Sequence, residues 1–252
     1  MNFNFTIHKD LLTASLLFRR NPKDAGRFTE LKNRMWDKHR EAYEIQNSTD
    51  YKFIFADDYK KKLENILEKT EALLTDTEGS SEYKDFYQET LKYRDWLENE
   101  WRTKRNEVEK HLKSILKTDP PPKDFEVLVI HPAVGGGSYL SDGKIFWGHS
   151  EDWGNYSLVY LVHEALHEYF EQSDLTHALI ELITDNELRV RLNKGGKYFT
   201  CDGKDVGHEY LRKLEQKMLP KWKAYLNSDN KKPSTIFDLQ KRLEESLKKN
   251  RA

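Results

Sequence analysis

Residues 158–170 read Leu-Val-Tyr-Leu-Val-His-Glu-Ala-Leu-His-Glu-Tyr-Phe and contain the pattern H-E-x-x-H at 163–167. Apolar residues recur at helical spacing here, at positions 158, 161, 162, 165, 166 and 169. His163 and His167 are four residues apart, so they share one face of the predicted helix, with about 6 Å between their Cβ atoms. At that separation two neutral imidazoles can bind one Zn²⁺ at about 2.0–2.1 Å each.

Glu164 directly follows the first histidine and occupies a neighbouring face of the same helix. From there its carboxylate can reach a metal-bound water without binding the metal itself. A short pattern such as H-E-x-x-H arises by chance in roughly 3–4% of chains of this length and composition, and it would then mark only an exposed helical face with two histidines. The apolar surroundings favour the metal site, because imidazoles beside a buried stripe need partners.

Composition and charge limit the class of protein. A chain of 252 residues forms one large domain or two small ones, and its formal net charge of −1 favours neither nucleic acid nor an anionic membrane as a partner. Cys201 is the only cysteine, so an intrachain disulfide is excluded. No apolar run has membrane-spanning length, and the first residues lack the pattern of a signal peptide. We therefore expect a soluble, cytoplasmic protein.

The sequence Asp-Pro-Pro-Pro-Lys at residues 119–123 divides the chain, because three consecutive prolines cannot continue a helix. Residues 1–118 are predicted to form a helical N-terminal region, and residues 124–252 a catalytic domain with C-terminal helices. The charged N-terminal helices, at 9–20, 28–45, 57–75 and from 80 to about 116, are expected to pack with solvated outer faces. The alternative is that they form the surface for a protein partner.

The second region begins with elements typical of a small sheet. Residues 125–130 are predicted to form a buried strand, and residues 138–147 a hairpin that turns at 141–144. Gly135-Gly136-Gly137 is interpreted as a loop beside the cleft. The predicted fold class is α+β, mostly helical, with a small mixed or antiparallel sheet and one edge strand above the H-E-x-x-H helix.

This order of strand, hairpin, H-E-x-x-H helix and a following helix with an acidic ligand resembles the zincin metallopeptidases, in their thermolysin-like branch with a glutamate ligand. The resemblance covers residues 125–195. It implies that Ile145-Phe146-Trp147 is the edge strand above the zinc and binds an extended peptide substrate by main-chain hydrogen bonds. From the apolar side chains of this strand we expect a preference for an apolar substrate residue near the scissile bond.

The third ligand is sought in the helix that begins at residue 173 or 174. Reflection of the histidine pair about a tight turn near 173 places Glu181 opposite it, and Asp185 one turn further, where it can accept a hydrogen bond from His163. The same residues resemble the E-x-x-x-D pattern of the family. Two alternatives remain: Glu187, which follows Asn186 as in thermolysin-like enzymes, and His177, one turn before Glu181.

The sequence thus predicts a zinc metallopeptidase in which His163, His167 and Glu181 hold Zn²⁺. Glu164 takes a proton from the metal-bound water and delivers it to the leaving amine. The oxyanion has four candidate partners: His208, Tyr210, Tyr198 and Tyr139. The alternative function is a binding or regulatory protein that keeps a zincin scaffold with little or no turnover, and the motif could also be a coincidence in a helical scaffold.

Overall fold

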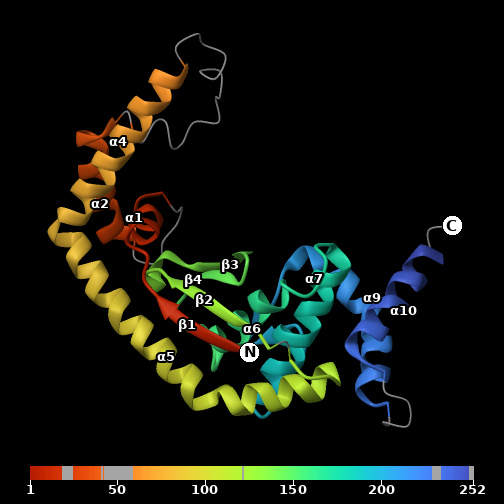
Figure 1. Cartoon of the computed structure of the whole chain (residues 1–252). Coiled ribbons are helices and arrows are strands. Elements are labelled where there is room, and N and C mark those ends of the chain that lie inside the picture. The colour runs from red at the N-terminus through yellow and green to blue at the C-terminus, as the bar shows by residue number, and fades with distance from the viewer. Residues whose placement is uncertain (19–24, 41, 43–58, 121, 229–233, 250–252) are drawn as a thin grey trace.

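The computed structural model describes residues 1–18, 25–40, 42, 59–120, 122–228 and 234–249. Within these residues the fold is α+β and predominantly helical, as the sequence predicts. The described residues contain a mixed sheet of four strands and a separate two-stranded sheet, and Figure 1 shows the N-terminal helices α2 (Ala25–Lys38) and α4 (Tyr59–Gly79) at a distance from the four-stranded sheet.

The four-stranded sheet has the order β1-β2-β4-β3. Strand β2 (Asp124–Val129) pairs in parallel with both β1 (Asn2–Thr6) and β4 (Lys144–Gly148), and β3 (Gly136–Ser141) pairs antiparallel with β4. The predicted strand and hairpin are confirmed. The prediction that residues 145–147 form the edge strand is wrong: β4 is paired on both sides, and the edge on this side is β3, which includes two of the glycines interpreted as a loop.

Strand β1 is the element of the N-terminal region that sequence reasoning missed. Its residues Asn-Phe-Asn-Phe-Thr alternate polar and apolar side chains, but the stretch is short and its partner β2 lies more than one hundred residues away. Phe3 of β1 opposes Phe125 of β2, and both rings are buried. The division proposed at residues 119–123 falls between a helix and β2, yet the two regions share one sheet.

The N-terminal helices form a core of their own. Helices α1 (Lys9–Phe18), α2 (Ala25–Lys38) and α4 (Tyr59–Gly79) pack against the beginning of α5 (Ser81–Leu116) and the segment after β2. The predicted helix ends at residues 19–20, 43–45 and 57–58 lie outside the described residues. The buried apolar side chains of this core include Leu12, Leu16, Phe28, Leu31, Leu73 and Phe86.

Helix α5 joins this core to the sheet. It begins where the Ser80 hydroxyl accepts a hydrogen bond from the Tyr83 N–H at 3.1 Å, and it ends at Lys117 in the left-handed conformation. Its 36 residues correspond to a length of about 54 Å. Figure 1 shows it as a curved helix that runs from the N-terminal helices past the sheet. The helix expected from residue 80 to about 116 is confirmed.

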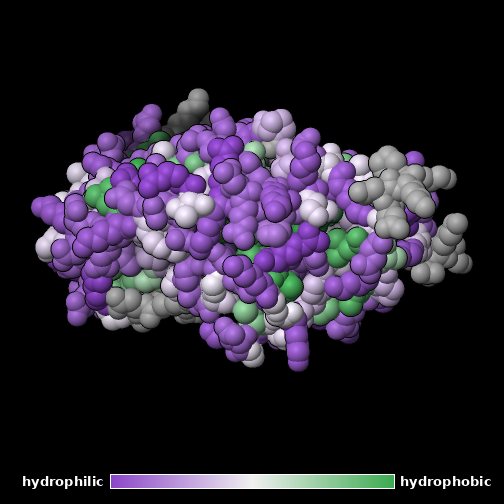
Figure 2. Space-filling model, turned by 90° about the horizontal axis from the view of Figure 1, so that it is seen from below, coloured by the Kyte–Doolittle hydropathy of each residue, from purple (hydrophilic) through white to green (hydrophobic). Residues whose placement is uncertain are grey.

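The remaining helices carry the candidate site or support it. Helix α6 (Tyr156–Leu166) is followed by α7 (Asp174–Glu181), π-helical turns at Leu182–Leu188 and α8 (Arg189–Leu192). Strands β5 (Thr200–Cys201) and β6 (Lys204–Asp205) precede α9 (Arg212–Leu226) and α10 (Ile236–Lys249). Single 3-10 turns lie at Pro132–Val134 and Glu209–Leu211. The face of the molecule seen in Figure 2, from below relative to Figure 1, carries mostly hydrophilic residues.

No helix in the described part of the chain combines the length and the apolar character needed to cross a membrane.

The indole ring of Trp147 in β4 lies directly over Gly137 of the edge strand β3. Gly137 pairs with Trp147, and a Cβ atom at Gly137 would lie 2.1 Å from Cε3 of the indole. The indole N–H is fixed by the Ser157 hydroxyl at 3.1 Å and the Tyr93 hydroxyl at 2.9 Å. Trp147 therefore cannot move aside without losing both hydrogen bonds, and β3 can follow its path only with glycine at this position.

We predict that Gly137→Ala destabilises the protein by about 1–3 kcal/mol, because the new methyl group overlaps the buried indole. Gly26→Ala is the matched control: a Cβ atom at Gly26 meets nothing within 4 Å, and alanine favours its helix by up to about 1 kcal/mol. Urea denaturation followed by circular dichroism measures both free energies of unfolding. Equal effects of the two substitutions would contradict the assigned role of Trp147.

Candidate metal centre

Helix α6 presents the H-E-x-x-H motif from a fully packed position. Its apolar residues at 158, 161, 162, 165 and 166 are buried in the main core, as their helical spacing predicts. The helix begins after Asn155, and the Glu151 carboxylate accepts a hydrogen bond from the Ser157 N–H at 2.9 Å near its first turn. His163 is 1% exposed, whereas His167, at the end of the helix, is half-buried. The motif is therefore anchored by the core and open at one end.

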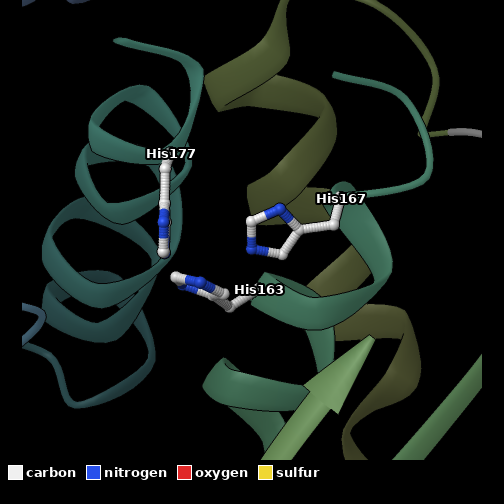
Figure 3. Close-up of side chains that lie close together, drawn as sticks. All are labelled: His163, His167 and His177. Carbon is white, nitrogen blue, oxygen red and sulfur yellow. The ribbon is translucent and has the colours of Figure 1, made fainter. Parts of the chain in front are cut away.

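Three histidines converge in front of α6. His163 and His167 come from α6 and His177 from α7, and a set of one potential ligand atom from each lies within 4.8 Å of one another. Figure 3 shows the three rings directed toward a common region between the two helices. Their ring centroids are 4.9–5.3 Å apart. Tetrahedral zinc needs about 3.3 Å between ligand atoms, so modest ring rotations would satisfy this geometry.

The unpaired nitrogen of His177 supports metal binding. Its Nε2 atom is buried without a hydrogen-bond partner among the described residues. Burial lowers the pKa of His167 to about 3 and that of His177 to about 4, and neighbouring histidines act in the same direction. Both rings are therefore neutral at pH 7, which is the form that binds a metal. A cation among these rings would supply the missing partner, so the residues present fit a zinc ion.

Asp185 contacts the first histidine of the motif. Its Oδ1 atom is 3.0 Å from Nδ1 of His163 and accepts a second hydrogen bond from the Thr184 hydroxyl at 2.8 Å. Burial by itself lowers the pKa of His163, but the charge and hydrogen bond of Asp185 outweigh it and raise the pKa to about 9. This contact directs Nε2 of His163 toward the other histidines. The support that Asp185 would give to a metal ligand stays a prediction.

Glu181 lies beside the three histidines and belongs to a second group with His177 and His208. Its Oε1 atom accepts hydrogen bonds from the main-chain N–H of His208 at 2.9 Å and from Nδ1 of the same residue, and it is 3.8 Å from Nε2 of His177. Its Oε2 atom is buried with no partner in the described structure. The hydrogen bond from Glu181 raises the pKa of His208. Ligation by Glu181 stays a prediction, while the geometry favours His177 beside the histidine pair.

The length of the loop between the two helices explains this difference. Sequence reasoning placed a tight turn near residue 173, which made Glu181 face the histidine pair. In the structure α6 ends at Leu166 and α7 begins at Asp174, so the connection spans residues 167–173 and its middle is residue 170. The facing position therefore moves back to residue 175, within one turn of His177.

Glu187 and Tyr198 face away from the histidines. The Glu187 carboxylate accepts hydrogen bonds from Nε of Arg191 at 2.8 Å and from the Tyr198 hydroxyl. The indole N–H of Trp222 donates to the same tyrosine oxygen at 3.1 Å. Neither Glu187 nor Tyr198 lines the pocket in front of the histidines.

Hydrogen bonds around the π-helical turns fix Glu181 and Asp185. The Asn186 side-chain amide donates to the Glu181 carbonyl at 2.9 Å and to the Glu215 carboxylate at 3.2 Å. Nε of Arg189 donates to the Asp185 carbonyl at 2.6 Å. These side chains pair carbonyl groups in the region where the regular α-helical pattern is interrupted, and π-helical turns often occur at functional sites.

Gly207 allows the Glu181 carboxylate to occupy its position. The residue has φ +82°, and a Cβ atom there would lie 2.5 Å from Oε2 of Glu181 and 3.5 Å from Oδ2 of Asp185. Any side chain would therefore collide with the carboxylate that holds His208.

Glu164 is held next to the edge strand. Its Oε2 atom accepts a hydrogen bond from the Tyr139 main-chain N–H at 2.7 Å, and burial raises the pKa of its carboxyl group. A carboxylate with a raised pKa is suited to take up and release a proton. The Tyr139 hydroxyl donates to Glu168, so it is already engaged.

A pocket of about 470 Å³ lies in front of the histidines and is bordered by β3 and by the start of α7. Ile145, Phe146 and Trp147 do not line it, and Ile145 and Trp147 are buried. Because β4 is a central strand, the premise on which they were predicted to bind substrate, an edge strand at 145–147, does not hold. Sequence reasoning missed the edge formed by β3, although Ser138-Tyr139-Leu140 in the predicted hairpin was a signal for it. The lining residues are Gly137, Ser138, Tyr139, His163, Glu164, His167, Gln172, Ser173, Asp174, Thr176, His177 and His208.

Comparisons with known proteins give no match: no protein-family model, no curated protein and no solved structure matches the chain.

We predict that the purified protein binds about one zinc ion per chain and that alanine at His163, His167 or His177 abolishes this binding, because each removes one nitrogen ligand. Glu181→Gln should retain the zinc, since Glu181 is bonded to His208. Glu187→Gln is the control, because its carboxylate faces another part of the molecule. Elemental analysis after dialysis measures the zinc content, and circular dichroism verifies folding. Loss of zinc in Glu181→Gln together with retention in His177→Ala would establish the ligand set predicted from sequence.

We also predict that the affinity for zinc rises by about tenfold per pH unit between pH 6 and 9 and then levels off. The pKa of His163 is raised to about 9, so the metal must displace one proton from this residue below that pH. His167 and His177 are already neutral and add nothing to the slope. Asp185→Asn should flatten the dependence, because it removes the charge that raises the pKa. Competition with a chelator at several pH values measures the affinity, and a flat profile for the unmodified protein would contradict the assignment.

Proposed function

We propose that the protein is a zinc-dependent metallopeptidase that hydrolyses peptide bonds in extended substrates. The observation that carries the proposal is the convergence of His163, His167 and His177 on one pocket that the Glu164 carboxylate also faces. Three nitrogen ligands with an open position are typical of catalytic zinc, whereas structural zinc is closed by four protein ligands. The half-exposed position of His167 at the mouth of the pocket agrees with an open site.

In this proposal the three histidines hold the zinc, and His177 takes the place that the sequence assigned to Glu181. Zinc supplies Lewis-acid chemistry, which makes a water molecule more acidic and polarises a carbonyl group. Asp185 holds the ring of His163 in the tautomer that leaves Nε2 free for the metal.

Glu164 is the residue that transfers the proton of the attacking water. Its carboxylate takes the proton of the attacking water and delivers it to the leaving amine, so it acts first as a base and then as an acid. Burial raises its pKa, and the hydrogen bond from the Tyr139 N–H fixes the orientation of its carboxylate.

We assign to His208 the role of stabilising the negative charge that develops on the carbonyl oxygen of the substrate. His208 lines the pocket, and the Glu181 carboxylate accepts a hydrogen bond from its Nδ1 and thereby fixes the ring. The same hydrogen bond raises the pKa of His208, which favours the charged form that stabilises an oxyanion. Tyr139 and Tyr198 are already engaged by Glu168 and Glu187.

Strand β3 provides the main-chain edge for the substrate. The Tyr139 N–H points away from β4 toward Glu164, and Gly137 lies two residues earlier on the same side of the strand. An extended peptide can pair with the main-chain groups of Gly137, which lines the pocket. The bond to be cleaved would then lie in front of the histidines.

A cytoplasmic location belongs to the same proposal and rests on the single cysteine, which leaves no intrachain disulfide to form.

We predict that Glu164→Gln retains zinc and lowers the rate of peptide hydrolysis by about a hundredfold or more, because the amide cannot accept the proton of the water. Cleavage of a denatured protein substrate by the zinc-loaded protein measures the rate, and elemental analysis measures the zinc. A zinc-loaded wild-type protein that binds peptides without cleaving them would instead support a binding protein on this scaffold. Cleavage by Glu164→Gln at the wild-type rate would exclude the assigned base.

A further inference from the structure

The chemistry of the pocket wall bears on which substrates fit. Its lining contains no aliphatic side chain and no lysine or arginine. The wall opposite β3 is polar and is formed by Gln172, Ser173, Asp174 and Thr176. An apolar substrate side chain would bury little apolar area here and would remove water from polar groups, so the apolar preference expected from the sequence has no support in this wall.

Asp174 is a carboxylate of this wall with no ion-pair or hydrogen-bond partner for its side chain in the described part of the chain. The neighbouring carboxylates are engaged: Glu164 by the Tyr139 N–H, Glu168 by Lys123 and Glu181 by His208. Asp174 is exposed at the first position of α7. Its negative charge therefore faces the mouth of the pocket without an ion-pair partner among the described residues.

Tyr210 supplies an aromatic ring on the same side. Its side chain is 64% exposed, and its hydroxyl is 3.2 Å from Nδ1 of His177. Its ring centroid is 5.5 Å from that of His208, a residue of the pocket lining. His177 lies three residues after Asp174 on α7, so the two side chains share a face of that helix and Tyr210 lies on the same side. The exposed ring face is available to a cation.

We propose that Asp174 and Tyr210 select a substrate with a lysine or arginine side chain next to the scissile bond. The carboxylate supplies the opposite charge, and the ring attracts the cation through its π-electron face. The positive end of α7 would favour an anion, but Asp174 sits at that end and offsets it. This inference rests on the proposed peptide hydrolysis, whose substrate class it specifies.

The test uses binding as well as cleavage. Zinc-loaded Glu164→Gln protein is titrated into fluorescently labelled peptides that differ at one position, which carries lysine, arginine, leucine or glutamate. Fluorescence anisotropy gives each Kd. An exposed ion pair and an exposed cation–π contact are each weak, so we expect the lysine and arginine peptides to bind about fivefold more tightly than the leucine peptide. The glutamate peptide should bind most weakly. The preference should shrink in high salt.

Substitutions at Asp174 and Tyr210 test whether these two residues cause the preference for cationic peptides. Asp174→Asn should reduce the difference between the lysine and leucine peptides to less than about twofold, and Asp174→Lys should reverse the order of the lysine and glutamate peptides. Tyr210→Ala should weaken the binding of the lysine and arginine peptides more than that of the leucine peptide. Tyr210→Phe should retain the preference because it retains the ring. Glu171→Gln is the matched control: this carboxylate is exposed three residues before Asp174 and does not line the pocket.

Equal binding of the lysine, leucine and glutamate peptides would overturn this inference, as would a preference that Asp174→Asn leaves unchanged. Cleavage of the same peptides by wild-type protein is scored separately. A binding preference without cleavage would contradict peptide hydrolysis and still support recognition of a cationic group at Asp174. Cleavage without a preference for lysine or arginine would support hydrolysis and reject the assigned specificity.

Discussion

Burial of the Asp185 carboxylate against His163 is the interaction on which the rest of the site depends. A buried carboxylate is costly unless it is paired and hydrogen-bonded, and here the histidine ring and the Thr184 hydroxyl satisfy one of its oxygens. The pair fixes the tautomer and the direction of the first histidine of the motif. The second carboxylate oxygen of Asp185 is buried without a described partner, so additional positive charge at the histidines would stabilise this part of the core.

Several other ionisable side chains are buried close to the Asp185–His163 pair. Glu181, Asp185, Arg189 and Glu215 are all at most 1% exposed, and the Asn186 amide links two of them. Burial raises the pKa of Glu215, and the charge of Glu181 raises it further. Nη1 of Arg212 contacts the Glu215 carboxylate at 3.0 Å and limits this repulsion. Such an arrangement costs stability unless every member is positioned, which agrees with the irregular π-helical turns and with the glycine at position 207.

The buried elements that fix the histidines are different from the exposed elements that border the pocket. One face of α6 packs into the main core against the sheet, and α5 extends from that core to a second one made by the N-terminal helices. The pocket is bounded instead by an edge strand and by an exposed loop, where main-chain groups and polar side chains face solvent. A site built this way keeps the histidines in place and leaves the edge of β3 open to an extended chain. This arrangement supports the proposed hydrolysis of unfolded segments.

The sequence by itself determined the parts of the site that depend on local geometry. Spacing of four residues on one helix places His163 beside His167, and helical periodicity marks the opposite, apolar face of α6 as the one to be buried. The strand before the motif and the hairpin were also predictable from short patterns. Tertiary structure alone decided that β4 is central, because β4 pairs in parallel with β2 as well as antiparallel with its hairpin partner β3. It also brought His177 to the histidine pair, because a loop longer by a few residues shifts the opposing helix by more than one turn, and periodicity within a helix contains no information about that loop.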